Sequence, residues 1–199
     1  MRKEDTIGVS GPWYPLDRLL RGRVSMYAVV EPFLEVCLLR RGPQDLPPSG
    51  LLLGLALVAY YLVSALTAMA VYGPGVGLLQ AGVEVITLAG YTYAGLQVAG
   101  RLARFWQTLI ALAGTGTVIG LVMVPLVYVL YPEASGNLAA VASMVYLLLV
   151  GWLLAVFGHI FRHALSFGHL GWGVLVALGY LVVSSVVLQG LFPMPQQGG

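Results

Sequence analysis

Charged residues are scarce in this chain of 199 residues. Asp, Glu, Lys and Arg together make up 9% of it, whereas hydrophobic residues make up 59% and the mean hydropathy is +0.88. A soluble domain carries roughly 25% charged residues, so this chain has too little polar surface to face water on all sides. The formal net charge of +2 is also too small to indicate a nucleic-acid partner. The composition therefore predicts an integral membrane protein in contact with the lipid bilayer.

Cysteine and catalytic signatures are scarce as well. The one cysteine, Cys37, excludes a disulfide within the chain and a zinc site built from several cysteines. The sequence has no G-x-S-x-G motif, no phosphate-binding P-loop and no second intramembrane acid to complete an aspartyl pair. We therefore expect a protein that is not an enzyme and that holds no cofactor.

Five apolar runs, each near the ~20 residues that cross a hydrocarbon core, predict an all-α protein with five transmembrane helices. They cover residues 51–72, 76–98, 109–130, 138–161 and 172–191. The transmembrane domain at 51–191 thus follows a polar head at 1–50 and precedes a short tail at 192–199. The very short connection Gly73-Pro74-Gly75 predicts that the first two helices form an antiparallel hairpin.

Cationic residues occur on only one side of this five-helix arrangement. They lie in the head and in the loops after the second and fourth helices: Arg2, Lys3, Arg18, Arg21, Arg23, Arg40, Arg41, Arg101, Arg104 and Arg162. Cytoplasmic segments of membrane proteins carry an excess of Lys and Arg. We therefore expect the N-terminus in the cytoplasm and the C-terminus on the external side.

The head is expected to contain an amphipathic helix at about residues 16–41. Its apolar residues recur at helical spacing, with arginines at both edges. Such a helix is typical of the membrane interface, which it would contact partly through Phe33 and Leu34. Packing on the cytoplasmic ends of the spans is the alternative. Pro32 is expected to kink or restart the helix, because proline removes a backbone hydrogen bond.

Glu84 is the only acidic residue inside an apolar run. Counting ~1.5 Å per residue from the helix ends places Ser64, Tyr146 and Ser184 at about its depth. An ionisable side chain at that depth usually faces the bundle and often marks a functional site, here a proton or cation site. The alternative, which we weight more heavily, is a protonated Glu84 that joins helices through hydrogen bonds to those hydroxyls.

The turn between the fourth and fifth helices holds all three histidines, as the set His159, Arg162, His163 and His169. His159 and His163 are four residues apart, so they share a helix face and could bind a metal. However, Ile160 stands where the zincin motif has its glutamate, and no carboxylate or cysteine is adjacent. We therefore favour contacts with helix-end carbonyls or lipid headgroups and expect no metal.

The chain resembles the Yip family of Ypt/Rab-interacting five-span membrane proteins and their bacterial relatives. The likeness covers roughly residues 40–191 and rests on the tight first hairpin and on the third span. That span begins Arg104-Phe105-Trp106-Gln107-Thr108-Leu109 and continues through Gly114, Gly116 and Pro125. The resemblance implies a bacterial inner-membrane location and a non-enzymatic membrane organiser or adaptor.

Three functional hypotheses follow from these observations. The leading one is an organiser or adaptor that acts through protein partners of its cytoplasmic head and through its helix interfaces. Small residues spaced by four, at Gly50 and Gly54, Gly116 and Gly120, and Gly90 and Ala94, favour close helix contacts or a homo-oligomer. The second hypothesis is a small ion- or proton-coupled transporter using Glu84. The third is a metal- or haem-binding subunit using His159 and His163.

Overall fold

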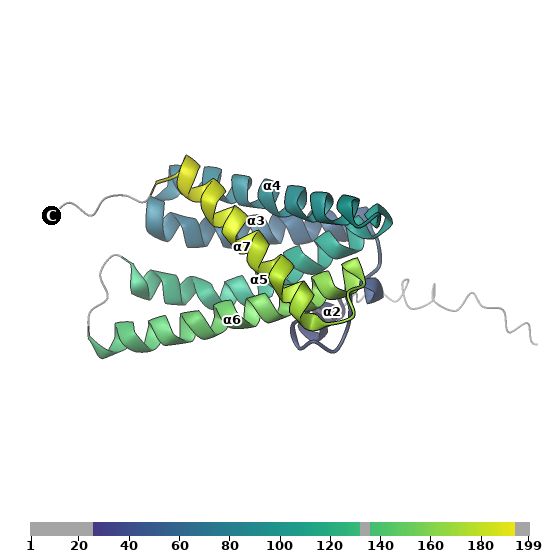
Figure 1. Ribbon diagram of the computed structural model, residues 1–199. Helices are drawn as coiled ribbons and strands as arrows, with labels where there is room; N and C mark the ends of the chain where they lie inside the picture. Colours follow the sequence, from purple (N-terminus) through teal and green to yellow (C-terminus); the bar gives the residue numbers. More distant parts are fainter. Residues whose placement is uncertain (1–25, 132–135, 194–199) are drawn as a thin grey trace, which may run out of the picture. The chain divides into compact units, whose positions relative to one another are not determined.

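The computed structural model describes residues 26–131 and 136–193, and within these ranges it is helical, without a strand. Six α-helices are present: α2 (Met26–Cys37), α3 (Gly50–Tyr72), α4 (Pro74–Val98), α5 (Phe105–Leu130), α6 (Asn137–Leu165) and α7 (Leu170–Leu191) (Figure 1). Two short 3₁₀ turns, η1 (Pro43–Asp45) and η2 (Leu102–Arg104), precede α3 and α5. Residues 1–31 and 32–199 form separate units, and the packing described below concerns the second unit.

Four of the described helices are long and apolar enough to cross a membrane: Gly50–Tyr72, Leu102–Leu130, Asn137–Leu165 and Leu170–Leu191. These confirm the first, third, fourth and fifth predicted spans. The second predicted span is helical, as α4, and its 25 residues are sufficient in length. It is not among the four. Gln80, Glu84 and Gln97 make it less apolar than its neighbours. Four of the five predicted spans are therefore present as apolar, membrane-length helices, and the count of five stays a prediction.

The five long helices pack in a closed ring. Neighbouring contacts run from α3 to α4, from α4 to α7, from α7 to α6, from α6 to α5 and from α5 back to α3. Figure 1 shows α3 and α4 side by side, with α7 crossing toward α6. Gly73 joins α3 to α4 at φ +80°, a conformation that glycine adopts without a Cβ clash, and Pro74 begins α4. The predicted antiparallel hairpin is thus present.

Helix α5 is the most buried of the five, and every residue from Thr108 to Gly116 is buried. In α6, by contrast, large apolar side chains such as Leu138, Val141 and Leu147 are exposed. Exposed apolar side chains along a long helix are unfavourable in water but suit contact with lipid chains. The bundle therefore has one largely buried helix, α5, and an outer surface compatible with a bilayer.

The α6–α7 hairpin depends on two glycines at the point where the helices meet. A Cβ on Gly173 would lie 2.0 Å from the backbone oxygen of Gly158. A Cβ on Gly158 would lie 2.6 Å from Cγ2 of Val174 and 3.0 Å from its Cα. Because backbone lies directly against backbone here, only glycine fits without moving one helix away from the other.

The predicted head helix at 16–41 is described from Met26 onward, and residues 16–25 lie outside the described residues. Helix α2 continues through Pro32 and ends at Cys37, short of the predicted Arg41. Phe33, expected at the membrane, is instead buried with its ring against Gly114 of α5, whereas Leu34 is exposed. The Cys37 thiol lies 4.0 Å from the carbonyl oxygen of Thr115. This part of the head therefore packs on α5, while its position relative to the membrane surface stays a prediction.

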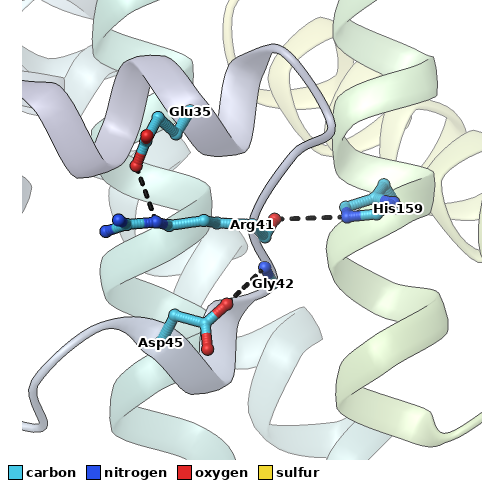
Figure 2. Close-up of polar contacts among 5 residues, drawn as sticks. All are labelled: Glu35, Arg41, Gly42, Asp45 and His159. Carbon is cyan, nitrogen blue, oxygen red and sulfur yellow. Dashed lines mark hydrogen bonds and ion pairs between the residues drawn. The ribbon is translucent and has the colours of Figure 1, made fainter.

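The segment between α2 and α3 is held to α6 by polar contacts (Figure 2). Arg41 Nε lies 2.6 Å from Glu35 Oε2, and the carbonyl oxygen of Arg41 lies 3.2 Å from His159 Nε2. The backbone N–H of Gly42 donates to Asp45 Oδ2 at 3.0 Å and closes the η1 turn. These bonds hold the end of the head beside the η2 turn, which carries Arg104, and the last turns of α6, which carry Arg162.

Candidate ligand site in the helix bundle

Glu84 lies midway along α4 and is partly buried. The hydroxyl of Tyr60, on α3, donates a hydrogen bond of 2.8 Å to its Oε1. The hydroxyl of Tyr180, on α7, lies 3.4 Å from that of Tyr60. A carboxyl group and two phenols from three different helices therefore form one hydrogen-bonded cluster inside the bundle.

The cluster faces a cavity of about 210 Å³. Its lining comes from all five long helices: Tyr60, Val63, Ser64, Thr67, Glu84, Gly116, Gly120, Met123, Tyr146, Val150, Leu153, Phe157, Tyr180, Leu181 and Ser184. The structure thus brings together the four residues that the sequence analysis grouped by depth: Glu84, Ser64, Tyr146 and Ser184. The five long helices therefore enclose this space between them.

Glycines on α5 bring the Tyr60 ring to the cavity. A Cβ on Gly116 would lie 2.8 Å from that ring, and a Cβ on Gly120 would lie 2.7 Å from Val63. This is one of the three small-residue pairs for which the sequence predicted close helix contact. A Cβ on Gly50, Gly54 or Gly90 would meet no described atom within 4 Å. Those other small-residue positions therefore make no close contact within the described bundle, and their role in a homo-oligomer stays a prediction.

The lining combines groups that bind a small polar or cationic solute. It offers one carboxyl, the hydroxyls of three tyrosines, two serines and one threonine, and the rings of Tyr180 and Phe157, whose centroids are 5.9 Å apart. Carboxylates attract cations, and aromatic faces stabilise them through the ring quadrupole. At about 210 Å³ the cavity is smaller than the ~300–1,000 Å³ typical of drug-sized ligands. It suits an ion with water, or a small solute.

Tyr60 and Tyr180 were missed by the sequence reasoning, although a signal was present. Each lies four residues before a serine that was identified, Ser64 on α3 and Ser184 on α7. Residues four apart share one helix face, so the tyrosine belongs to the same polar stripe as its serine. The repeated Tyr-x-x-x-Ser spacing in two apolar helices could have indicated both tyrosines.

The histidine stretch forms no comparable cluster. His159, Arg162 and His163 lie in the last turns of α6 rather than in a loop, and His169 is an exposed residue that precedes α7. The rings of His159 and His163 are in edge contact, with centroids 4.5 Å apart. Among the described residues, no three His, Cys, Asp or Glu side chains are grouped to hold a metal ion. Whether the protein contains a metal stays a prediction.

The described arginines lie on the segments that meet at one end of the bundle. Arg104 Nη1 donates to the carbonyl oxygen of His163 at 2.9 Å, and Arg101 donates to Ser166 Oγ. These bonds join the α4–α5 loop to the end of α6, and His159 joins α6 to the segment that carries Arg41. We call this part of the molecule, with Arg40, Arg41, Arg101, Arg104 and Arg162, the basic end.

Together, the apolar helices and the polar cavity define an α-helical membrane protein with an internal polar site. Comparison with protein-family models, curated proteins and solved structures gave no match.

Proposed function

We propose that the chain spans the membrane five times, with the basic end in the cytoplasm of a bacterium and the opposite end outside. Helix α4 supports the fifth span, since 25 residues at ~1.5 Å each reach about 38 Å, enough for a hydrocarbon core. Its contacts with both α3 and α7 are those of a member of the helix ring. The gathering of the described arginines at one end supports the orientation, because cationic segments stay on the cytoplasmic side.

Within this arrangement, the function that the geometry supports best is a small ion- or proton-coupled carrier whose ligand group is Glu84. The observation that carries this proposal is the cavity: Glu84, Tyr60 and Tyr180 line a space to which all five long helices contribute. A carboxyl that served only to join α3 and α4 would need the Tyr60 hydrogen bond and close packing around it. Here the Glu84 carboxyl lies instead beside a cavity that tyrosine and serine side chains also line.

A membrane flux assay tests the carrier function. Purified protein in proteoliposomes with trapped pyranine would be given inward gradients of protons, Na⁺, K⁺ or methylammonium. Wild-type protein should raise the flux of at least one of these ions, and Glu84→Gln should fold normally yet abolish that flux. Thr87→Val is the matched control. Thr87 is on the same helix and does not line the cavity, and its hydroxyl donates to the carbonyl oxygen of Val83.

Two results would argue against the carrier. The first is a wild-type protein that moves none of these ions under any gradient, and the second is a flux that Glu84→Gln leaves unchanged. Either would return the Yip-like organiser or adaptor to first place, with Glu84 as a helix-joining side chain. In that case protein partners that co-purify from mild detergent with the full chain, cytoplasmic head included, would be the expected finding.

A further inference from the structure

A second cavity opens at the basic end. It measures about 440 Å³ and is lined by Gln44, Arg104, Arg162, His163, Ser166 and Phe167. These residues come from the η1 turn, from η2, from the end of α6 and from the α6–α7 loop. We call it the basic hollow. Its lining includes two arginines, a histidine and two uncharged hydrogen-bonding side chains, and it contains no acidic residue.

The arginines of the basic hollow form no ion pair with an acid of the described residues. Glu35 is paired with Arg41, which gives the one ion pair found among residues 26–131 and 136–193. Asp45 accepts the backbone N–H of Gly42, and its carboxylate also interacts electrostatically with His163. Arg162 forms no ion pair within those described ranges and lines the hollow directly. Two guanidinium groups therefore face the same open space.

The carbonyl end of α6 would ordinarily repel an anion, because a helix C-terminus carries partial negative charge. Arg104 counters this effect. Its Nη1 donates to the carbonyl oxygens of His163 at 2.9 Å and Ala164 at 3.4 Å, and to Ser166 Oγ at 3.0 Å. Those acceptors are thereby satisfied, and the same bonds hold the guanidinium in position at the edge of the hollow.

Tryptophans indicate that the hollow is at headgroup level. Trp106 at the start of α5 is 50% exposed, and Trp172 at the start of α7 is 59% exposed. Both lie close in sequence to residues of the basic end, one near Arg104 and the other just after the α6–α7 loop. Exposed tryptophans at the ends of spanning helices gather at the level of lipid headgroups. An anion that binds in the hollow is therefore within reach of the bilayer surface.

We propose that the basic hollow binds the phosphate group of an anionic phospholipid. The chemistry is a phosphate diester held by Arg162 and Arg104, with Gln44 and Ser166 as further polar contacts. Guanidinium groups suit phosphate because their N–H donors match its oxygens in pairs. Phe167, a partly buried lining residue, supplies an apolar contact. The proposal does not depend on the carrier function, since the hollow shares no lining residue with the Glu84 cavity.

Native mass spectrometry of the full chain from mild detergent tests this proposal. The protein would be titrated with phosphatidylglycerol or with phosphatidylcholine of the same acyl chains. We expect wild-type protein to bind one phosphatidylglycerol in clear preference to phosphatidylcholine. Arg162→Gln should weaken that first binding event by about five-fold, the typical effect of one basic residue at a membrane surface. Arg40→Gln is the matched control, because Arg40 is exposed in the same part of the molecule but does not line the hollow.

Arg162→Gln is preferred to Arg104→Gln because loss of Arg104 would also remove the contacts that hold the end of α6. Equal phosphatidylglycerol affinity in wild type and Arg162→Gln would overturn the proposal. So would an equal loss in Arg40→Gln, which would indicate diffuse attraction to the whole basic end. A third arm adds glycerol phosphate and inorganic phosphate at millimolar concentration. Displacement of the lipid by either would assign the hollow to a soluble phosphate and overturn the lipid assignment.

Discussion

Replacing Gly173 by alanine should destabilise the bundle strongly, because the new Cβ would meet backbone rather than a movable side chain. That Cβ would lie 2.0 Å from the Gly158 oxygen, 2.9 Å from the Arg162 nitrogen and 3.0 Å from the Arg162 Cβ. Overpacking of a core typically costs about 1–3 kcal/mol. Since neither helix backbone can turn aside as a side chain would, we expect a cost of about 3 kcal/mol, at the upper end of that range.

Gly171→Ala is the matched control for this substitution. Gly171 is two residues earlier in the same helix, and a Cβ there would meet no described atom within 4 Å. Alanine is a better helix residue than glycine, so this variant should be neutral or gain up to about 1 kcal/mol. Unfolding of both variants by SDS in mixed micelles, followed by far-ultraviolet circular dichroism, measures the difference. A difference of less than about 0.5 kcal/mol between the two unfolding free energies would be well below the overpacking cost. It would mean that α6 and α7 are not in backbone contact at these glycines.

Three further predictions concern the site, the head and the topology. Tyr60→Phe should lower the free energy of unfolding by about 0.6–1.7 kcal/mol through loss of the hydrogen bond to Glu84. Tyr61→Phe is the control and should have little effect, because the Tyr61 hydroxyl makes only an exposed 3.3 Å contact with the carbonyl oxygen of Leu78. Equal effects of the two substitutions would contradict this account. Burial raises the pKa of the Cys37 thiol to about 11, so at pH 8 the folded protein should react slowly with maleimide. Its rate should still rise above pH 9, where an ordinary thiol has levelled off, and rapid labelling at pH 8 would contradict the burial. Reporter fusions after Gly136 should read external and fusions after Phe167 cytoplasmic; the reverse pattern would invert the proposed orientation.

The helices and their connections could be predicted well from the sequence. Long apolar runs have few alternatives in a chain with so little charge, and the Gly73-Pro74 step leaves no room for a longer loop. The helix ends were less predictable. Helix α6 continues to Leu165, four residues past the predicted end, so that Arg162 and His163 became helical. The apolar pattern ends near Phe161, whereas backbone hydrogen bonds continue until Ser166 takes up a left-handed conformation at φ 54°.

The packing of the head was harder to predict than the spans. An amphipathic pattern in the head identifies an apolar face but not what covers it, since lipid and the side of a span are equally apolar. The residue that decides the matter is Gly114 on α5, whose missing side chain leaves room for the Phe33 ring. Gly114 is far from Phe33 in the sequence. Nothing in the local pattern of either segment indicates that they meet.

The candidate site was only partly predictable, for a reason particular to membrane helices. In water the apolar stripe of a helix marks its buried face, but in a bilayer both the lipid-facing and the protein-facing sides are apolar. Counting residues gives the depth of a side chain but not its rotation about the helix axis. Depth alone was enough to associate Ser64 and Ser184 with Glu84. It could not select Tyr60 from its neighbour Tyr61, although only Tyr60 reaches the carboxyl. Rotation is set by the glycines of α5, because Gly116 receives the Tyr60 ring and thereby turns its hydroxyl toward α4.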